Sequence, residues 1–317
     1  MRHQAKFTLV DVFTSRTFGG NQLAVFSDAT GISDAEMQAL AQELNFSEST
    51  FVTASDVAGV VRRVRIFTPA REIPMAGHPT VGTAWVLASH GQIPLKSSRI
   101  NLDATLELGI GPVTVTIESA NAQPEFVWMN HREAEFGAIR RDLERIADAL
   151  GIEAAGIRDD LPIQIVSTGF PFIYVPLRST DVLARCAPNK TALIELFDKG
   201  EQRLPIYLFV VKEQAPFVVR ARMFAPHTDN IPEDPATGSA AAPFGAYAAT
   251  HGLIKPEPRA AFLIQQGVEM GRPSDIHVEV MRKDNGALAI RIGGRCAIVG
   301  EGAMFLERPA TSAPRRA

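Results

Sequence analysis

The chain of 317 residues contains an internal repeat, and this feature limits its possible folds more than any other. Four short blocks recur in the same order in the second half, at offsets between 156 and 161 residues. The paired blocks are residues 65–69 with 222–226, 73–74 with 231–232, 78–84 with 234–240, and 88–91 with 249–252. Ordered recurrence of this kind favours duplication over chance similarity of turn-rich segments. We therefore expect two similar halves with a site between them.

Each copy predicts the same local structure, namely a strand, a proline-bounded loop and a buried apolar helix that ends at a His-Gly pair. The helices are expected at residues 82–90 and 240–251. Because the offset grows from 156 to 161 along the copy, the second helix is expected to be five residues longer. His78 and Asp234 occupy the matched polar position of the two loops in this alignment.

The remaining pattern predicts strands in groups with helices between them, which favours a mixed α+β fold over a doubly wound parallel sheet. Further helices are expected after the capping-box residue Ser33, at residues 142–150 and at 190–197. We expect an N-terminal half at 1–120, completed by a strand near 297–307, and a C-terminal half at 121–296. Residues 309–317 are expected to form a flexible tail.

Composition excludes several classes of function. The 32 basic and 35 acidic residues give a net charge of −3, too little positive charge for a nucleic-acid or membrane-surface protein. No signal peptide and no long apolar run is present, so we expect a cytoplasmic protein. The seven histidines and two cysteines, Cys186 and Cys296, form no metal-binding spacing, and no metal site is expected.

The two helix starts predict an anion site. Helix N-termini carry unpaired N–H groups and a partial positive charge, and Gly77, Gly82 and Gly238 leave the backbone open to close approach. If the copies face one another, His78 and Asp234 can bind substrate or transfer protons. The structural alternative is that both residues only cap helices or brace loops.

Two nucleotide-binding patterns are absent. The segment 77–83 resembles a phosphate-binding loop but has Thr83 where that loop requires lysine. No Gly-x-Gly-x-x-Gly follows a predicted strand, which argues against a dinucleotide cofactor.

Eight segments in order resemble the phenazine-biosynthesis PhzF-like isomerase family. They are 11–14 (Asp-Val-Phe-Thr), 20–25 (Gly-Asn-Gln-Leu-Ala-Val), 45–52 (Asn-Phe-Ser-Glu-Ser-Thr-Phe-Val), 65–69 (Arg-Ile-Phe-Thr-Pro), 76–79 (Ala-Gly-His-Pro), 233–240 (Glu-Asp-Pro-Ala-Thr-Gly-Ser-Ala), 266–274 (Gln-Gly-Val-Glu-Met-Gly-Arg-Pro-Ser) and 299–302 (Val-Gly-Glu-Gly). One departure is Gln22, where the family usually has proline.

The resemblance implies a diaminopimelate-epimerase-like fold, in which each half wraps a mixed sheet around a central helix. It also implies a cofactor-independent isomerase, a homodimer and a small carboxylic acid substrate. Related epimerases carry a cysteine in each glycine-rich loop, and neither loop has one here, so two-thiol racemisation is not expected. By similarity, the catalytic residues are Glu48, His78 and Asp234. The substrate-binding residues are Gly77, Gly238, Ser239 and Asn21.

These residues lead to one mechanistic hypothesis, in which Glu48 removes a C–H proton and returns it at another carbon while the helix-end amides stabilise a dienolate. From the residue pattern alone, Glu48 is interpreted as a solvated residue that precedes a strand. Two alternatives stay open: an epimerase, racemase or dehydratase of an amino or hydroxy acid, and a non-catalytic binding protein that retains the fold.

Overall fold

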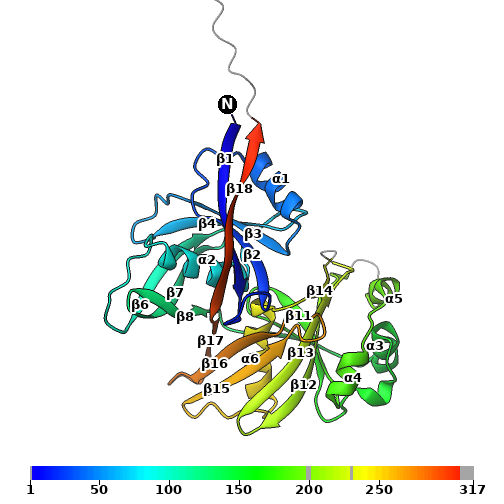
Figure 1. Ribbon diagram of the computed structural model, residues 1–317. Coiled ribbons are helices and arrows are strands. Elements are labelled where there is room, and N and C mark those ends of the chain that lie inside the picture. The colour runs from blue at the N-terminus through cyan, green and yellow to red at the C-terminus, as the bar shows by residue number, and fades with distance from the viewer. Residues whose placement is uncertain (1, 198–200, 229–230, 308–317) are drawn as a thin grey trace, which may run out of the picture.

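The computed structural model describes residues 2–197, 201–228 and 231–307, so the tail predicted at 309–317 lies outside the described residues. Two lobes lie one above the other, and each contains a curved sheet packed on one central helix (Figure 1). Strands and helices are grouped rather than strictly alternating. The predicted α+β class is confirmed.

The first lobe contains most elements of the N-terminal part of the chain. These are β1 (Arg2–Val12), β2 (Asn21–Phe26), α1 (Asp34–Leu44), β3 (Glu48–Thr53), β4 (Arg62–Phe67), β5 (Glu72–Ile73), α2 (Gly77–Ser89), β6 (Ile100–Leu108), β7 (Gly111–Ala120) and β8 (Gln123–Asn130). Helix α1 begins as predicted, because the Ser33 side chain accepts a hydrogen bond from the Glu36 N–H and the Glu36 carboxylate accepts from the Ser33 N–H.

The second lobe contains the following elements, apart from the last strand, which returns to the first lobe. They are β9 (Glu135–Arg140), α3 (Leu143–Leu150), the short 3₁₀ helix η1 (Ala154–Gly156), β10 (Ile163–Ser167), β11 (Pro171–Pro176), α4 (Thr180–Arg185), α5 (Lys190–Glu195), β12 (Ile206–Gln214), β13 (Phe217–Ala225), β14 (Ile231–Asp234), α6 (Gly238–Thr250), β15 (Arg259–Gln266), β16 (Ser274–Arg282), β17 (Leu288–Gly294) and β18 (Cys296–Glu307).

The strands of the two lobes are connected in the same order. In the first, neighbours run β18–β1–β2–β3–β4–β6–β7–β8. In the second they run β9–β10–β11–β12–β13–β15–β16–β17. Parallel pairs fall at matching places, at β2–β3 and β4–β6 and at β11–β12 and β13–β15. Strands β8 and β17 join the sheets.

Helices α2 and α6 both contain 13 residues, so the prediction of a longer second helix was wrong. Helix α2 begins at Gly77 rather than Gly82, because Pro79 lies in its first turn, where a missing N–H breaks no helical hydrogen bond. Helix α6 begins at Gly238, two residues before the expected start. Gly77 and Gly238 therefore begin equivalent helices.

The register of the short strands corrects the predicted equivalence of His78 and Asp234. Ile66 pairs with Ile73, and Met223 pairs with Asp234. Because β4 and β13 are equivalent strands, Asp234 corresponds to Ile73. Asp234 follows Met223 by eleven positions, whereas Ile73 follows Ile66 by only seven. The additional residues in the second copy shifted the sequence alignment.

Apolar side chains of both lobes form one continuous core cluster around α2 and α6. Val81 and Leu87 from α2 and Phe244 and Tyr247 from α6 are fully buried, as expected for helices that are apolar on every side. None of the helices in the described ranges is long and apolar enough to cross a membrane.

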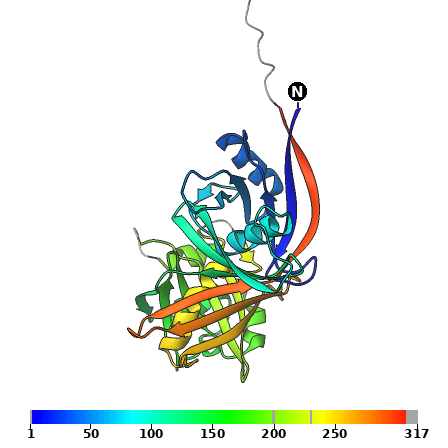
Figure 2. The ribbon, with the colours of Figure 1, turned by 90° about the vertical axis from the view of Figure 1, so that its left-hand side faces the viewer.

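The C-terminal strand β18 crosses back to the first lobe and runs antiparallel to β1 (Figures 1 and 2). The strand predicted near 297–307 is therefore present at Cys296–Glu307. The division of the chain at residue 120 stays a proposal. Since β8 pairs with β7, we place the boundary in the connection that follows β8, at residues 131–134.

Candidate active site

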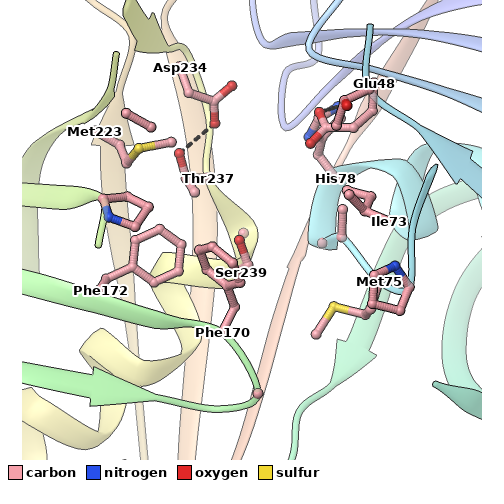
Figure 3. A pocket seen from close by; sticks show the side chains of 18 of the residues that line it. Glu48, Ile73, Met75, His78, Phe170, Phe172, Met223, Asp234, Thr237 and Ser239 are labelled. Carbon is pink, nitrogen blue, oxygen red and sulfur yellow. Dashed lines mark hydrogen bonds and ion pairs between the residues drawn. The ribbon is translucent and has the colours of Figure 1, made fainter. Parts of the chain in front are cut away.

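A pocket of about 390 Å³ lies between the two lobes. Figure 3 shows that each lobe supplies one wall. One wall carries Glu48, Ile73, Met75 and His78. The facing wall carries Phe170, Phe172, Met223, Asp234, Thr237 and Ser239. The pocket therefore combines a few polar groups with broad apolar surfaces, which is typical of sites for small organic ligands.

The N-termini of α2 and α6 meet at this pocket. A Cβ atom on Gly77 would lie 3.0 Å from the Cα and C atoms of Gly238 and from the backbone N of Ser239. Neither N-cap residue, Ala76 or Thr237, makes a side-chain capping hydrogen bond to its helix. First-turn amides of two helices consequently face one small region, where their partial positive charges favour an anion.

Glu48 is the first residue of β3 and lies on the pocket wall beside α2. Its Oε2 atom is 3.5 Å from Nε2 of His78. The Glu48 side chain is 13% exposed and that of His78 is 5% exposed. Glu48 is thus a largely buried carboxyl group facing a pocket rather than a solvated residue.

His78 is the second residue of α2, and its ring is enclosed by protein. Burial lowers the pKa of His78 to about 3, against a weaker opposing effect of a backbone hydrogen bond with Gln22. The imidazole is therefore neutral at physiological pH, and its contact with Glu48 is not an ion pair. A neutral ring can hydrogen-bond a substrate or the Glu48 carboxyl without neutralising a negative charge on Glu48.

Asp234 ends β14 on the opposite wall. Its Oδ2 atom accepts a 2.5 Å hydrogen bond from Oγ1 of Thr237, and its Oδ1 atom accepts a 2.8 Å bond from Nδ2 of Asn21. Burial raises the pKa of Asp234 to about 6, while the bonds from Thr237 and Asn21 lower it. Both protonation states are accessible near neutral pH, which suits a group that binds or exchanges a proton.

Gln266, at the end of β15, organises the loop before α6 and was not among the predicted site residues. The fully buried side chain donates through Nε2 to the Asp234 carbonyl (2.7 Å) and to Oγ1 of Thr237 (2.9 Å), and it accepts the Thr237 N–H (3.2 Å). Its only sequence signal is its place in the segment 266–274 that resembles the family.

Asn21, the first residue of β2, lies behind the pocket lining and connects the two walls. Its Nδ2 atom lies 2.8 Å from Oδ1 of Asp234, 3.0 Å from the Ala236 carbonyl oxygen and 3.2 Å from Nδ1 of His78. The side chain is 1% exposed. Protein acceptors therefore surround its amide, and we propose that Asn21 positions His78 and Asp234 rather than binding substrate.

The other predicted binding residues line the pocket. Gly77 and Gly238 lie at the helix starts, and Ser239 lies on the first turn of α6 at the place that corresponds to His78. Cys186 and Cys296 are buried and do not belong to the lining. Within the described ranges, no three His, Cys, Asp or Glu side chains gather in a way that could hold a metal ion.

The fold and the pocket define a class of α+β proteins in which two similar lobes enclose one pocket. A family model described as phenazine biosynthesis-like protein matches residues 10–302. The chain therefore belongs to the PhzF-like phenazine biosynthesis family.

Relatives of similar length support this assignment. A trans-2,3-dihydro-3-hydroxyanthranilate isomerase of Pseudomonas fluorescens is 34% identical over 301 residues, which cover 95% of this chain and 99% of that protein. A protein of Clostridium acetobutylicum named an uncharacterized isomerase is 33% identical over 301 residues, covering 94% and 97% of the two chains. The predicted membership of an isomerase family is confirmed.

Solved structures show the same fold. The PhzF-family phenazine biosynthesis protein of Bacillus anthracis matches with a TM-score of 0.86 at 27% identity, covering 96% of this chain and 100% of that chain. A hydroxyproline epimerase from Agrobacterium vitis matches with a TM-score of 0.67 at 11% identity, over 96% and 92% of the two chains, and so shares the fold alone.

Proposed function

We propose that the protein is a cofactor-independent isomerase that moves one proton between two carbons of a small carboxylic acid. The observation that carries this proposal is the carboxyl group of Glu48 in a pocket where two helix N-termini meet. A base beside an oxyanion-stabilising backbone is the arrangement that proton abstraction next to a conjugated acid requires.

In the proposed reaction, the Glu48 carboxylate takes a proton from an activated C–H bond of the bound acid. The bonding electron pair delocalises into the conjugated system and gives a dienolate. Amides at Gly77 and Gly238 stabilise the developing negative charge, while His78, Asp234 and Ser239 orient the acid. The protonated Glu48 then returns the proton to another carbon, so substrate and product have the same composition.

The asymmetry of the two lobes supports a single proton carrier. Glu48 precedes Ser49, which pairs with Phe67, and the equivalent pair in the second lobe is Ile206 with Phe224. The residue before Ile206 is Pro205, which also lines the pocket but carries no acid or base. A racemase that used this same position in both lobes would require a titratable group at residue 205.

The first acid to test is trans-2,3-dihydro-3-hydroxyanthranilate, because it is the substrate in the names of relatives that align over nearly the whole chain. The protein and candidate acids are incubated in heavy water, and NMR follows product formation and deuterium incorporation. We expect turnover by the wild type and a loss of at least about 100-fold in Glu48→Gln, in line with removal of a general base. Equal rates in both proteins would show that Glu48 has another role.

We further propose that the protein is a cytoplasmic homodimer, as the family resemblance implies. Light scattering after size-exclusion chromatography measures the assembly, and a mass of about 34 kDa instead of about twice that value would contradict the dimer.

A further inference from the structure

We propose that Phe170 determines the specificity of the pocket by packing against a flat apolar group of the bound acid. The substrate would then carry such a group beside its carboxylate, unlike a small hydroxy or amino acid. This inference rests on the proposed function, because it assigns the substrate class of the same pocket.

Phe170 occupies the position in the second lobe that corresponds to Asn21 in the first. Ala24 in β2 and Ile173 in β11 are equivalent, because each pairs with the equivalent position of the next strand in its lobe. Asn21 precedes Ala24 by three positions, and Phe170 precedes Ile173 by three. Both residues also follow a glycine with a positive φ, 62° in the first lobe and 121° in the second. The two side chains are therefore related by the duplication.

The groups around the Asn21 amide have counterparts around Phe170. Three groups lie 2.8–3.2 Å from Nδ2 of Asn21, namely Oδ1 of Asp234, the Ala236 carbonyl oxygen and Nδ1 of His78. The equivalent residues, all 161 positions earlier or later in the chain, are Ile73, Met75 and Ser239. Phe170 has no hydrogen-bonding side-chain group, and two of its three counterpart neighbours are apolar. The pocket thus has a polar half (Asn21, His78 and Asp234) and an apolar half (Phe170, Ile73 and Met75).

The two halves also differ in exposure. Asn21 is 1% exposed, whereas Phe170 is 38% exposed although it lines the pocket. Figure 3 shows Phe170 near Ser239 on one wall and Met75 on the other. The Cε atom of Met75 lies 3.8 Å from the place that a Cβ on Gly169 would take, so this side chain reaches the loop that carries Phe170. An aromatic surface is therefore accessible to a ligand in the apolar half.

The ring of Phe170 is oriented by its neighbour Phe172. The two ring centroids are 5.2 Å apart and the ring planes meet at 64°, which is an edge-to-face contact. Phe172 is 2% exposed and belongs to the central core cluster. Because Phe170 is held by a fixed core residue, a ligand that packs on it has little side-chain freedom to remove.

The apolar half adjoins the proposed carboxylate site. Figure 3 shows Glu48, His78 and Asp234 toward one end of the pocket and Phe170 with Met75 toward the other. An acid held at the helix starts between these ends would place its reacting carbon near Glu48 and the rest of its body in the apolar half. A small hydroxy or amino acid would leave the Phe170 ring exposed to water, whereas a flat apolar group would cover it.

Crotonate and cinnamate form a matched pair of probes, because they carry a methyl or a phenyl group at the same carbon of one unsaturated acid. In calorimetric titrations we expect the wild type to bind cinnamate at least about tenfold more tightly than crotonate. Phe170→Ala should lose most of this preference. Phe170→Leu should keep part of it, since leucine restores an apolar contact without an aromatic face. Phe136→Ala removes a similarly exposed phenylalanine outside the pocket and should keep the preference.

Equal affinities of the wild type for the two acids, or no measurable binding of cinnamate, would overturn the role of Phe170. An unchanged preference in the Phe170 variants would do the same. Thermal unfolding verifies that each variant is folded. If Phe170→Ala does not fold, the comparison of Phe170→Leu with wild type decides the result.

The titrations are repeated with Glu48→Gln to separate this result from the proposed function. A retained cinnamate preference together with undiminished deuterium exchange in Glu48→Gln would refute the role of Glu48 and leave that of Phe170 standing. The opposite result, a lost exchange activity in Glu48→Gln with no cinnamate preference in the wild type, would refute the role of Phe170 alone.

Discussion

At the scale of single residues, burial in one pocket shifts two titratable groups in opposite directions. Burial disfavours the charged form of each group, so the pKa of His78 falls to about 3 and that of Asp234 rises to about 6. Both side chains are therefore pushed toward neutrality. At neutral pH His78 is uncharged, whereas Asp234 has access to both protonation states. We propose that the Glu48 carboxylate is the principal base in reach of a bound acid.

Replacing Asp234 with asparagine should stabilise the protein in a pH-dependent way. The folded-state pKa of Asp234 lies above its ordinary value of 3.8, so its favourable contribution is complete below that value and is lost as pH rises through about 6. Asparagine cannot ionise. The difference in unfolding free energy between Asp234→Asn and wild type should grow from pH 4 to pH 8, reaching about 3 kcal/mol.

Denaturant unfolding at several pH values measures this difference, with the exposed Asp56→Asn as the control for loss of surface charge. A stability difference that stays constant or shrinks as pH rises would contradict the assignment. The same Asp234→Asn variant should bind and turn over substrate less well, since it loses an ionisable group at the site.

The residues of the candidate site differ in how far the sequence alone could predict them. The physics of helix ends directed attention to the glycines of the two loops, but the repeat predicted the first helix start at Gly82, and only the family resemblance assigned Gly77 and Gly238 to substrate binding. Glu48 does not follow from the residue pattern, because a polar residue before a strand is usually solvated, and only the family resemblance singled it out. The supporting hydrogen bonds of Gln266 depend on tertiary contacts 29 to 32 residues away, which no local pattern encodes.

At the scale of elements, each lobe repeats one ion pair between a strand and the short strand that follows it. Arg65 binds Glu72 through two hydrogen bonds of 2.8 and 2.6 Å, and Arg222 binds Glu233 through two of 2.8 Å. Each guanidinium also lies over a phenylalanine of its own strand. These pairs fix the strands that lead into α2 and α6.

The two ion pairs should differ in their contribution to stability. The Arg222 and Glu233 side chains are 9% and 15% exposed, against 18% and 42% for Arg65 and Glu72. Arg222 also donates to the carbonyls of Leu183 and Cys186. We expect Arg222→Met to lower the unfolding free energy by about 3–5 kcal/mol and Arg65→Met by about 1 kcal/mol, because a buried carboxylate is left unpaired only in the first case.

Unfolding in guanidinium chloride measures the unfolding free energy of Arg222→Met and of Arg65→Met. The double variant Arg222→Met with Glu233→Met should recover part of the loss, since it removes the unpaired charge. If Arg222→Met and Arg65→Met lost equal amounts of unfolding free energy, burial would not make the two ion pairs differ in their contribution to stability.

The junction of the helix starts should tolerate change at one glycine better than at the other. A Cβ on Gly77 meets backbone atoms of the facing helix at 3.0 Å, whereas a Cβ on Gly238 first meets the side chains of Phe13 at 3.2 Å and Ile292 at 3.3 Å. Backbone cannot repack as side chains do. Gly77→Ala should therefore cost about 1–3 kcal/mol of stability and most of the activity, and Gly238→Ala less of both.

Thermal or denaturant unfolding together with steady-state kinetics measures the two glycine variants. If Gly238→Ala lost more stability and activity than Gly77→Ala, the helix starts would not be packed as described.

The elements were predicted better than their boundaries. Both central helices follow from the apolar runs and the His-Gly stops, and their ends at Ser89 and Thr250 agree with the prediction to within one residue. The start of α2 was misplaced because Pro79 suggests a loop locally. His78 was misaligned with Asp234 because matching of short motifs does not detect the insertion between β13 and β14 of the second copy.

At the scale of the whole molecule, a duplicated scaffold carries asymmetric chemistry. Glu48 and Asp234 come from opposite lobes, and their equivalents, Pro205 and Ile73, cannot ionise. Asn21 spans the junction and contacts groups on both walls. We therefore propose that the active form of the site requires both lobes in a fixed relation.

Asn21→Ala tests this link between the lobes. Removing a hydrogen bond that lowers the pKa of Asp234 should raise that pKa above about 6. The pH profile of kcat/KM should shift to higher pH along its acidic limb, and the maximal rate should fall. Gln22→Ala on the same strand, whose side chain is exposed, is the control. An unshifted profile in Asn21→Ala would mean that Asn21 does not act through Asp234.

The most direct test of the central claim is a crystal structure of Glu48→Gln with an acid that the wild type isomerises. We expect the carboxylate of that acid at the amides of Gly77 and Gly238, with the reacting carbon within about 3.5 Å of the residue 48 side chain. An acid bound outside the cleft, or with its reacting carbon directed away from residue 48, would contradict it.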